Sequence, residues 1–359
     1  ARAQDLVEQR EEDTSDTGAS AAPGCPSEPS GSASPPPGSV QLTAASPRCA
    51  AYVTWEPFAT TGALPSANHG FTTALDAEHG RMLLFGGCTD ATVRGTCLSS
   101  MSILNLETNA WSTLAVAPSA ASPGPRKSST AAMLDGAMYL FGGLADGAVT
   151  NDVFTFAMDP PRWSRPAITG SKPPEREGHA AVALPSRGMM VFGGFSDLGY
   201  YNDLWLYVPN PPHWLAPAST GPKPSARKGH AMVYMNDRVY VWGGSAATCA
   251  ETSMHVLDLN TMAWSVVSSA ASHAPPAREG HVLLAVQNRL VMFGGCNFNA
   301  HTCYNETHIY EPSAQMWEQL PHHAGAPASR HGLAAVARGS LVTMYGGCQV
   351  GHRCFNDAW

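Results

Sequence analysis

Charged residues and long apolar runs are both scarce in this sequence. Asp, Glu, Lys and Arg make up 14% of its 359 residues, about half of the usual share. The formal net charge is −7, and most of it falls in residues 1–16, where six acidic residues face two arginines. The rest is nearly neutral, which excludes the basic surface that nucleic acids or anionic membranes require. No apolar run reaches the ~18 residues of a membrane span. No signal peptide is visible at Ala1, although a mature chain would have lost one.

Long helix-forming stretches are also lacking, because glycine and proline are abundant. The chain has 34 Gly and 29 Pro, together about 18% against a usual 12% or so. These are the two poorest helix formers, so long helices and coiled coils are excluded. Apolar residues make up 44% of the chain, which is enough for a sizeable core.

Residues 1–48 lack the apolar side chains that a folded core needs. An acidic head (1–17) precedes a stretch in which Gly18–Ser39 contain only Cys25 and Glu28 outside Gly, Ala, Ser and Pro. Such a composition cannot offset the loss of chain entropy on folding. We expect residues 1–48 to form a flexible, solvated tail. The alternative is an arm that becomes ordered on a partner.

A repeat with a period near fifty residues follows the tail. Short apolar runs end in a pair of glycines at six places: Gly86-Gly87, Gly142-Gly143, Gly193-Gly194, Gly243-Gly244, Gly294-Gly295 and Gly346-Gly347. A tryptophan recurs with the same period, at Trp55, Trp111, Trp163, Trp214, Trp264 and Trp317. Self-similarity at this period is typical of solenoids and propellers.

Two more motifs share the period. An Arg-x-Gly-His step precedes the glycine pairs at Arg176–His179, Arg227–His230 and Arg278–His281, with degenerate copies at Arg126, Arg330 and Asn68. An Asn-Asp or Asn-Glu step follows them at Asn151, Asn202, Asn305 and Asn356. Each unit therefore predicts four short strands separated by Gly, Pro and Asn turns. Sheets of this size cover their apolar faces by packing radially around an axis.

These motifs resemble kelch repeats, which build β-propellers. The resemblance covers about residues 52–359 and depends on the combination of Gly-Gly pairs with downstream tryptophans, repeated six times. It implies an all-β, six-bladed kelch β-propeller with four-stranded blades over residues 49–359, preceded by the flexible tail. The chain has no Trp-Asp ending of the WD40 kind.

The six tryptophans are offset from the six glycine pairs. Trp55 has no glycine pair before it, and Gly347 has no tryptophan after it. We therefore expect an N-terminal strand around Trp55 to complete the blade of residues 331–359 and close the ring. The alternative is a chain that continues past Trp359 with a seventh blade.

The nine cysteines are many for a protein in a reducing compartment. Three glycine pairs are each followed by two cysteines within one loop: Cys88 with Cys97, Cys296 with Cys303, and Cys348 with Cys354. We predict a disulfide in each loop. Metal binding is the alternative, but the spacings differ from the short Cys-x2-Cys of zinc sites. Cys25, Cys49 and Cys249 cannot be paired from sequence.

A glycosylation sequon supports the setting that the cysteines indicate. Asn305-Glu306-Thr307 is an N-glycosylation acceptor sequence. With the loop cysteines, it predicts a secreted glycoprotein in an extracellular, cell-surface or secretory lumenal location.

The repeated His and Arg side chains predict structural roles. His179, His230 and His281 recur once per unit, so we expect them to pack and bond within the blades rather than to catalyse. The repeated arginines are expected to order the start of the innermost strand, with the alternative that they give the pore mouth positive charge.

Some kelch-like propellers are enzymes, notably copper-containing galactose oxidases and sialic-acid mutarotases. The oxidase constellation of two Tyr, two His and a cross-linked Cys cannot be placed in this sequence, because each loop Cys has a Cys partner. No catalytic triad, phosphate loop or carboxylate pair emerges either. We expect no catalytic residue, cofactor or metal.

The resemblance implies a contact face made by the loops between second and third strands and between blades. Exposed aromatic and charged residues anchor interfaces. The candidates in these loops are Asp90, Arg94, Asp146, Asp197, Tyr200, Tyr201, Glu251, Asn297, Phe298, His301, His352 and Arg353.

Two functions remain open from sequence. The first is a non-catalytic extracellular interaction module that binds a protein, or a surface glycan, within a larger assembly. The second is an extracellular carbohydrate-active or copper-dependent enzyme on the same ring. An intracellular kelch adaptor is a weaker third possibility, since no adaptor domain lies in the chain.

Overall fold

The structure of the chain is a computed structural model with only β-strands as regular secondary structure in its described part. It describes residues 40–41 and 54–359, apart from 90–95, 117–118, 248–251, 268–273, 323–324 and 352. The predicted tail (1–48) and the cysteines Cys25, Cys49 and Cys249 therefore lie outside the described residues, apart from the strand at 40–41. A helix capable of crossing a membrane is absent from this part of the chain.

Five sheets each contain four successive antiparallel strands, in the order that the repeat predicts. We call these sheets blades A to E. The strands of blades A and B are β3 (Thr72–Asp76), β4 (Arg81–Phe85), β5 (Met101–Asn105) and β6 (Ala110–Leu114), then β8 (Thr130–Leu134), β9 (Ala137–Ala145), β10 (Ala148–Met158) and β11 (Pro161–Ser164). Those of blade C are β12 (Ala180–Leu184), β13 (Gly188–Phe192), β16 (Leu204–Pro209) and β17 (Pro212–Leu215). Those of blades D and E are β18 (Ala231–Met235), β19 (Arg238–Trp242), β20 (Met254–Asp258) and β21 (Ala263–Val267), then β22 (Glu279–Val286), β23 (Arg289–Asn297), β25 (Thr307–Glu311) and β26 (Met316–Gln319).

Short strands extend this framework at its edges. The segments β14 (Phe195–Ser196), β15 (Gly199–Tyr200) and β24 (Thr302–Cys303) belong to the hairpins beyond the glycine pairs, and β7 (Arg126–Lys127) pairs with the end of β9. The segment β2 (Thr61–Gly62) pairs in parallel with β6 at the outside of blade A. Two more strands, β27 (Ala334–Arg338) and β28 (Leu341–Tyr345), form a smaller sheet with β1 (Val40–Gln41).

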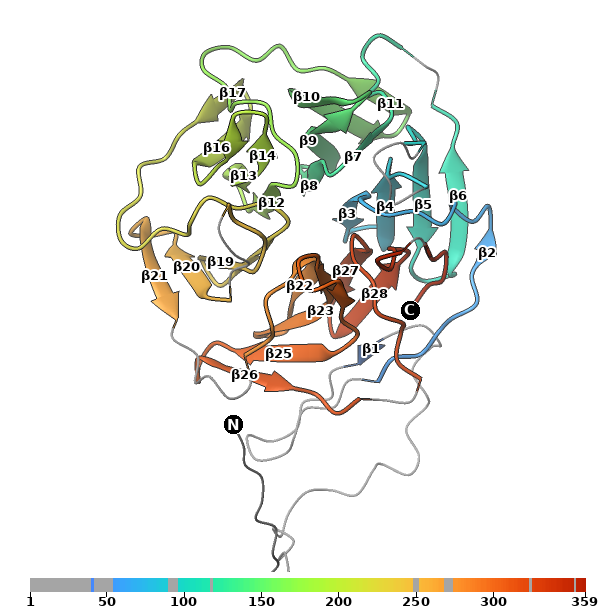
Figure 1. Cartoon of the computed structure of the whole chain (residues 1–359). Coiled ribbons are helices and arrows are strands. Elements are labelled where there is room, and N and C mark those ends of the chain that lie inside the picture. The colour runs from blue at the N-terminus through green and yellow to red at the C-terminus, as the bar shows by residue number, and fades with distance from the viewer. Residues whose placement is uncertain are drawn as a thin grey trace, which may run out of the picture.

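The sheets surround a central axis as a β-propeller, with the first strand of each unit innermost (Figure 1). The innermost strands contact their neighbours in one closed sequence: β3, β8, β12, β18, β22, β27 and back to β3. The first and second strands of each unit are antiparallel, so the second strand ends where the first one begins. The hairpins that join the second and third strands therefore all lie at this end of the ring. We call this end the loop face.

The hydrophobic core is divided among the contacts between neighbouring sheets. One cluster joins Phe141 and Val153 of blade B to Val191 and Trp214 of blade C, and the other clusters follow the same plan. The Trp214 ring lies 4.8 Å from the Phe141 ring of the preceding blade. The tryptophans recur once per unit because each one packs on the neighbouring sheet that precedes it in the order around the ring. The residue that it contacts there is the aromatic residue directly before the glycine pair.

A cycle of backbone hydrogen bonds surrounds the axis at the loop face. Each Gly of the Arg-x-Gly-His step, or its counterpart Ser128, donates its N–H to the carbonyl of the equivalent residue in the preceding unit. The donors are Gly70, Ser128, Gly178, Gly229, Gly280 and Gly332, at N···O distances of 2.8–3.1 Å. A positive φ is needed for this turn, as at Gly229 (66°), where a Cβ would lie 2.8 Å from the Glu279 carboxylate. Glycine fits because it alone adopts this conformation without steric cost.

The structure has five four-stranded blades rather than the six predicted. The residues around Trp55 do not form the expected strand, since 54–60 have no strand pairing. Pro57 gives a physical reason, because proline cannot donate a ladder hydrogen bond within a sheet. Trp55 still packs as its counterparts do, with its ring 4.8 Å from that of Phe293. In a complete blade a third strand would pair with β28. Trp359 occupies one end of that position, where it exchanges two backbone hydrogen bonds with Met344 of β28.

Candidate functional site

The predicted contact residues that the structure describes lie in the hairpins of the loop face. Asp146 and Asp197 are exposed at hairpin turns of blades B and C. Phe298 and His301 are exposed in the hairpin of blade E, and Arg353 is exposed in the loop after β28. Four candidates, Asp90, Arg94, Glu251 and His352, lie outside the described residues.

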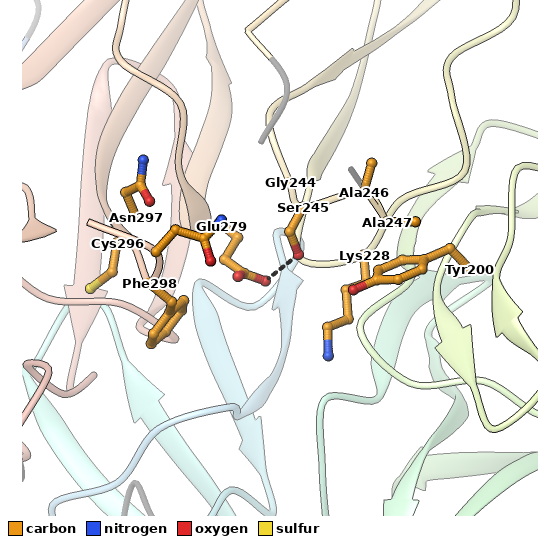
Figure 2. Close-up of a pocket in the computed structure, with 11 residues that line it drawn as sticks. Tyr200, Lys228, Gly244, Ser245, Ala246, Ala247, Glu279, Cys296, Asn297 and Phe298 are labelled. Atoms are coloured by element: carbon orange, nitrogen blue, oxygen red, sulfur yellow. Dashed lines mark hydrogen bonds between the residues drawn. The ribbon is translucent and has the colours of Figure 1, made fainter. Parts of the chain in front are cut away.

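Three of the candidates line one cavity. Tyr200 reaches it from blade C, and Asn297 and Phe298 reach it from blade E. The cavity has a volume of about 280 Å³ and its lining includes Gly244–Ala247 of blade D. We call it the pore-mouth pocket, defined by Tyr200, Lys228, Ser245, Glu279, Asn297 and Phe298. Figure 2 shows Glu279 beside Ser245, with Phe298 and Asn297 on one side and Lys228 and Tyr200 on the other.

Tyr201 has a different environment from its neighbour Tyr200. Its ring lies 4.5 Å from the Arg176 guanidinium, and its hydroxyl is 2.7 Å from that of Ser196. These contacts give Tyr201 a role inside blade C. Alanine at this position would therefore perturb the blade as well as the loop face.

Two charged residues of the pore-mouth pocket were not predicted. Lys228 and Glu279 occupy the variable position of the Arg-x-Gly-His step, which continues around the axis as Lys127, Glu177, Lys228, Glu279, His331 and His69. The step as a whole was assigned to structure because it recurs. The signal that could have revealed the site is that, in the three complete copies of the step, this position changes from Glu177 to Lys228 to Glu279 while the Arg, Gly and His around it stay the same.

The electrostatics of the pore-mouth pocket centre on Glu279. Burial raises the pKa of this carboxyl, while a hydrogen bond from Ser245 and the charge of Lys228 act in the opposite direction. The Ser245 hydroxyl donates to Oε2 at 2.9 Å. The Lys228 ammonium lies 4.7 Å from the centre of the Phe195 ring, a cation–π contact that positions it at the side of the cavity.

Two histidines lie beside the pocket. The His331 ring is 5.0 Å from the ring of Phe298 and 5.7 Å from that of His69. Burial lowers the pKa of His331 to about 4, with His69 and Lys127 contributing in the same direction. At neutral pH His331 is therefore an uncharged support for Phe298.

The repeated arginines are buried, so they do not give the pore mouth a positive rim. Arg176, Arg227, Arg278 and Arg330 have no exposed surface. In blade C, Nη1 of Arg176 donates to the Gly193 carbonyl at 2.8 Å, and its two terminal nitrogens lie 2.6 and 2.7 Å from the Asp203 carboxylate. The carboxylates come from the Asn-Asp or Asn-Glu step, at Asp152, Asp203, Glu306 and Asp357. In these four units the arginine thus connects the start of the first strand with the second and third strands.

The repeated histidines pack between sheets, in agreement with their predicted structural role. His179, His230 and His281 each contact the aromatic ring that precedes the glycine pair of the preceding blade, at 5.0–5.5 Å. Burial lowers the pKa of His230 and His281 to about 3, and the neighbouring arginines add to the effect. These side chains are neutral in the folded protein.

The three predicted loop disulfides are present: Cys88–Cys97, Cys296–Cys303 and Cys348–Cys354. Each joins residues that face one another across a hairpin, with Cα atoms 4.0 Å apart. They hold the hairpins of three consecutive units of the loop face, and Cys296 lies in the wall of the pore-mouth pocket.

We expect the double variant Cys296→Ser/Cys303→Ser to lower the free energy of unfolding by about 2.5 kcal/mol, because the bridge restricts a short loop of the unfolded chain. Chemical denaturation of both proteins measures this difference. Alkylation of the unreduced parent should leave all six loop cysteines unmodified, and labelling of Cys296 or Cys303 would contradict the assignment.

One group of metal-ligating side chains lies close together within the described part of the chain. His69, Cys348 and Cys354 offer ligand atoms within 4.8 Å of one another. The two sulfurs are joined as a disulfide, so neither is available as a thiolate ligand. The copper-dependent alternative gains no support from this group.

The fold and its motifs match a known family. The family model described as the KLHDC2/KLHL20/DRC7 Kelch-repeats domain matches residues 50–244 and 210–359. The chain is 31% identical to Acyl-CoA-binding domain-containing protein 5 of Arabidopsis thaliana, over 53% of this chain and 30% of that protein. It is 27% identical to Kelch domain-containing protein 3 of Homo sapiens, over 66% of this chain and 68% of that protein.

A third relative is Multiple epidermal growth factor-like domains protein 8 of Homo sapiens. It is 27% identical over 79% of this chain, but the match covers only 11% of the relative. The plant and this human relative are therefore much longer than the region they share with this chain.

Proposed function

Because the chain belongs to the kelch-repeat family, we propose that it is a protein-interaction module whose loop face binds a partner protein. The observation that carries this proposal is the exposure of apolar side chains at the hairpin tips of the loop face. Leu198 is 88% exposed, Phe298 41% and Val350 37%. They come from three different hairpins of the loop face, in blades C and E and in the loop after β28.

Such tips are suited to protein contact. An exposed leucine at a turn gains nothing from the fold of its own chain, whereas burial against a partner removes apolar surface from water. Phe298 is held against His331 and borders a concave pocket, which is the arrangement in which aromatic anchors contribute most to binding. The charged walls of the pocket add polar groups that determine orientation and partner choice.

We place this module in an extracellular or secretory lumenal setting. Three loop disulfides support this, since disulfides persist in oxidising compartments. The sequon at Asn305 supports it as well, because this residue is only partly buried and lies in a segment without regular secondary structure. One relative carries epidermal growth factor-like domains in its name, and such domains are rich in disulfides.

We also infer that the sheet of β27 and β28 acts as a sixth, incomplete blade that closes the ring. The cycle of six backbone hydrogen bonds around the axis supports this, as does the contact of β27 with both β22 and β3. Trp55 and Trp359 both pack into the core cluster between blade E and this sheet. In this arrangement residues 49–359 form one propeller unit and residues 1–48 a separate tail.

We expect the double variant Leu198→Ser/Phe298→Ala to bind a partner isolated from the native source at least ~10-fold more weakly, because it removes two apolar anchors. A matched control is Leu215→Ser, which changes a 45% exposed leucine of the outer strand β17, away from the loop face. Affinities are measured by surface plasmon resonance with the purified full chain. Unchanged binding of the double variant, or an equal loss in the control, would contradict the proposal.

A further inference from the structure

We propose that the pore-mouth pocket binds a single basic side chain, arginine or lysine, of the partner segment that contacts the loop face. The inference builds on the proposed interaction function and names the chemistry that this pocket recognises. It depends on three features of the pocket: a carboxylate with unused acceptor capacity, aromatic walls, and a cation at the far side.

The carboxylate of Glu279 has room for a further donor. It belongs to the first residue of β22, whose backbone faces Cys296 of the disulfide-bonded hairpin, so the side chain starts from a rigid position. An ionised carboxylate has about four acceptor sites. Within the part of the chain that the structure describes, Ser245 supplies the one hydrogen bond to the Glu279 carboxylate, and it uses Oε2. Glu279 lines the cavity (Figure 2), so a donor that enters the cavity can approach its carboxylate.

The aromatic walls favour a cation over a neutral donor. Phe298 stands on the same side of the cavity as Asn297, and Tyr200 stands on the opposite side (Figure 2). Cations are attracted to the faces of such rings, and arginine also stacks on them. Phe298 is supported from behind by His331, which is buried and neutral. A guanidinium or ammonium group can therefore bind Glu279 while its alkyl stem covers the exposed ring of Phe298.

Lys228 limits the pocket to one basic residue. Its ammonium group is held beside the Phe195 ring, and its charge acts on Glu279. A second cation in the partner segment would be repelled by Lys228, whereas an acidic residue next to the basic one would be attracted. The pocket therefore selects a basic residue in a mixed-charge context and rejects a polybasic segment.

The direct test is an NMR titration of the full chain, carrying ¹³C-labelled phenylalanine rings, with the peptide Ac-Ala-Arg-Ala-NH2. We expect saturable shifts of the Phe298 signal at millimolar peptide, and at least ~10-fold weaker binding of Ac-Ala-Gln-Ala-NH2, because charged groups make the stronger hydrogen bonds. Glu279→Gln should abolish the preference for the arginine peptide, and Lys228→Met should strengthen binding of that peptide. Equal binding of the two peptides to the parent chain would overturn the inference.

A second variant separates loss of charge from loss of fold. Glu279→Gln retains an oxygen that accepts the Ser245 hydrogen bond, and Ser245→Ala removes that bond but keeps the carboxylate. We expect Ser245→Ala to retain the preference for the arginine peptide, and both variants to unfold within a few degrees of the parent chain. Loss of the preference in Ser245→Ala at an unchanged unfolding temperature would contradict a charge-based site.

The two proposals fail in different ways. If Leu198→Ser/Phe298→Ala loses the partner while Glu279→Gln binds it like the parent chain, the interaction function stands and the basic-residue site is wrong. If the loop-face variant keeps the partner, the interaction function is wrong even where the arginine peptide binds.

Discussion

Replacing Arg176 with alanine is expected to lower the free energy of unfolding by about 3–5 kcal/mol, because it removes a fully buried side chain and leaves two backbone carbonyls and the half-buried Asp203 carboxylate without their hydrogen-bond donor. Arg176 has no exposed surface and joins three parts of blade C. It donates to the carbonyls of Pro174 and Gly193 and to the carboxylate of Asp203. Burial alone would raise the pKa of Asp203, but the hydrogen bonds and charge of Arg176 lower it below its ordinary value.

Equilibrium denaturation in urea measures this loss. The matched control is Arg162→Ala, since Arg162 is exposed on β11 and surface substitutions of this kind usually change stability by less than ~0.5 kcal/mol. Asp203→Asn should also destabilise the blade, because it removes the counter-charge of a buried guanidinium. A loss below about 1 kcal/mol for Arg176→Ala would show that the buried ion pair does not hold the blade together.

Lowering the pH from 7.5 to 5 is expected to destabilise the protein by roughly 2 kcal/mol for each of the buried histidines His230, His281 and His308. Burial lowers the pKa of all three to about 3 in the folded state, with nearby arginines contributing. Their pKa in the unfolded chain is near 6.5. The unfolded state therefore binds more protons between pH 6.5 and 3, and stability is lost as the pH falls through this window.

Urea denaturation at several pH values between 7.5 and 5 tests the prediction. The slope of unfolding free energy against pH should decrease by about one proton equivalent in His230→Gln and stay the same in His301→Gln, which alters an exposed turn residue. A stability that is constant over this range would mean that the repeated histidines are not buried in their neutral form.

Much of the fold followed from the sequence because each repeated residue has one packing role. The tryptophans had a constant spacing because each packs on the aromatic residue of the preceding sheet, and the loop cysteines faced one another because they flank short hairpins. The Trp55 segment was the failure. Its tryptophan has the same spacing and packing as the others. The segment 54–60 forms no strand, because Pro57 cannot donate a ladder hydrogen bond and because Trp359 occupies one end of the third-strand position beside β28.

The site was harder to predict than the fold. Tyr200, Asn297 and Phe298 were recognisable because they interrupt the repeat, and the structure brings them to one cavity. Lys228 and Glu279 were hidden inside a repeated motif whose arginine, glycine and histidine have structural roles. Only the cyclic arrangement places these two charges from different units in the same pocket, and no local sequence pattern carries that information.

Site-specific photo-crosslinking is the most direct test of the loop face as the contact surface. A photoreactive phenylalanine analogue is introduced at Leu198, at Phe298, or at Asn288, an exposed turn residue at the opposite end of blade E. The full chain is irradiated with its native partner, and the products are mapped by mass spectrometry. The interaction account predicts partner peptides attached at positions 198 and 298 and none at 288. Crosslinks at 288 without crosslinks at 198 and 298 would contradict it.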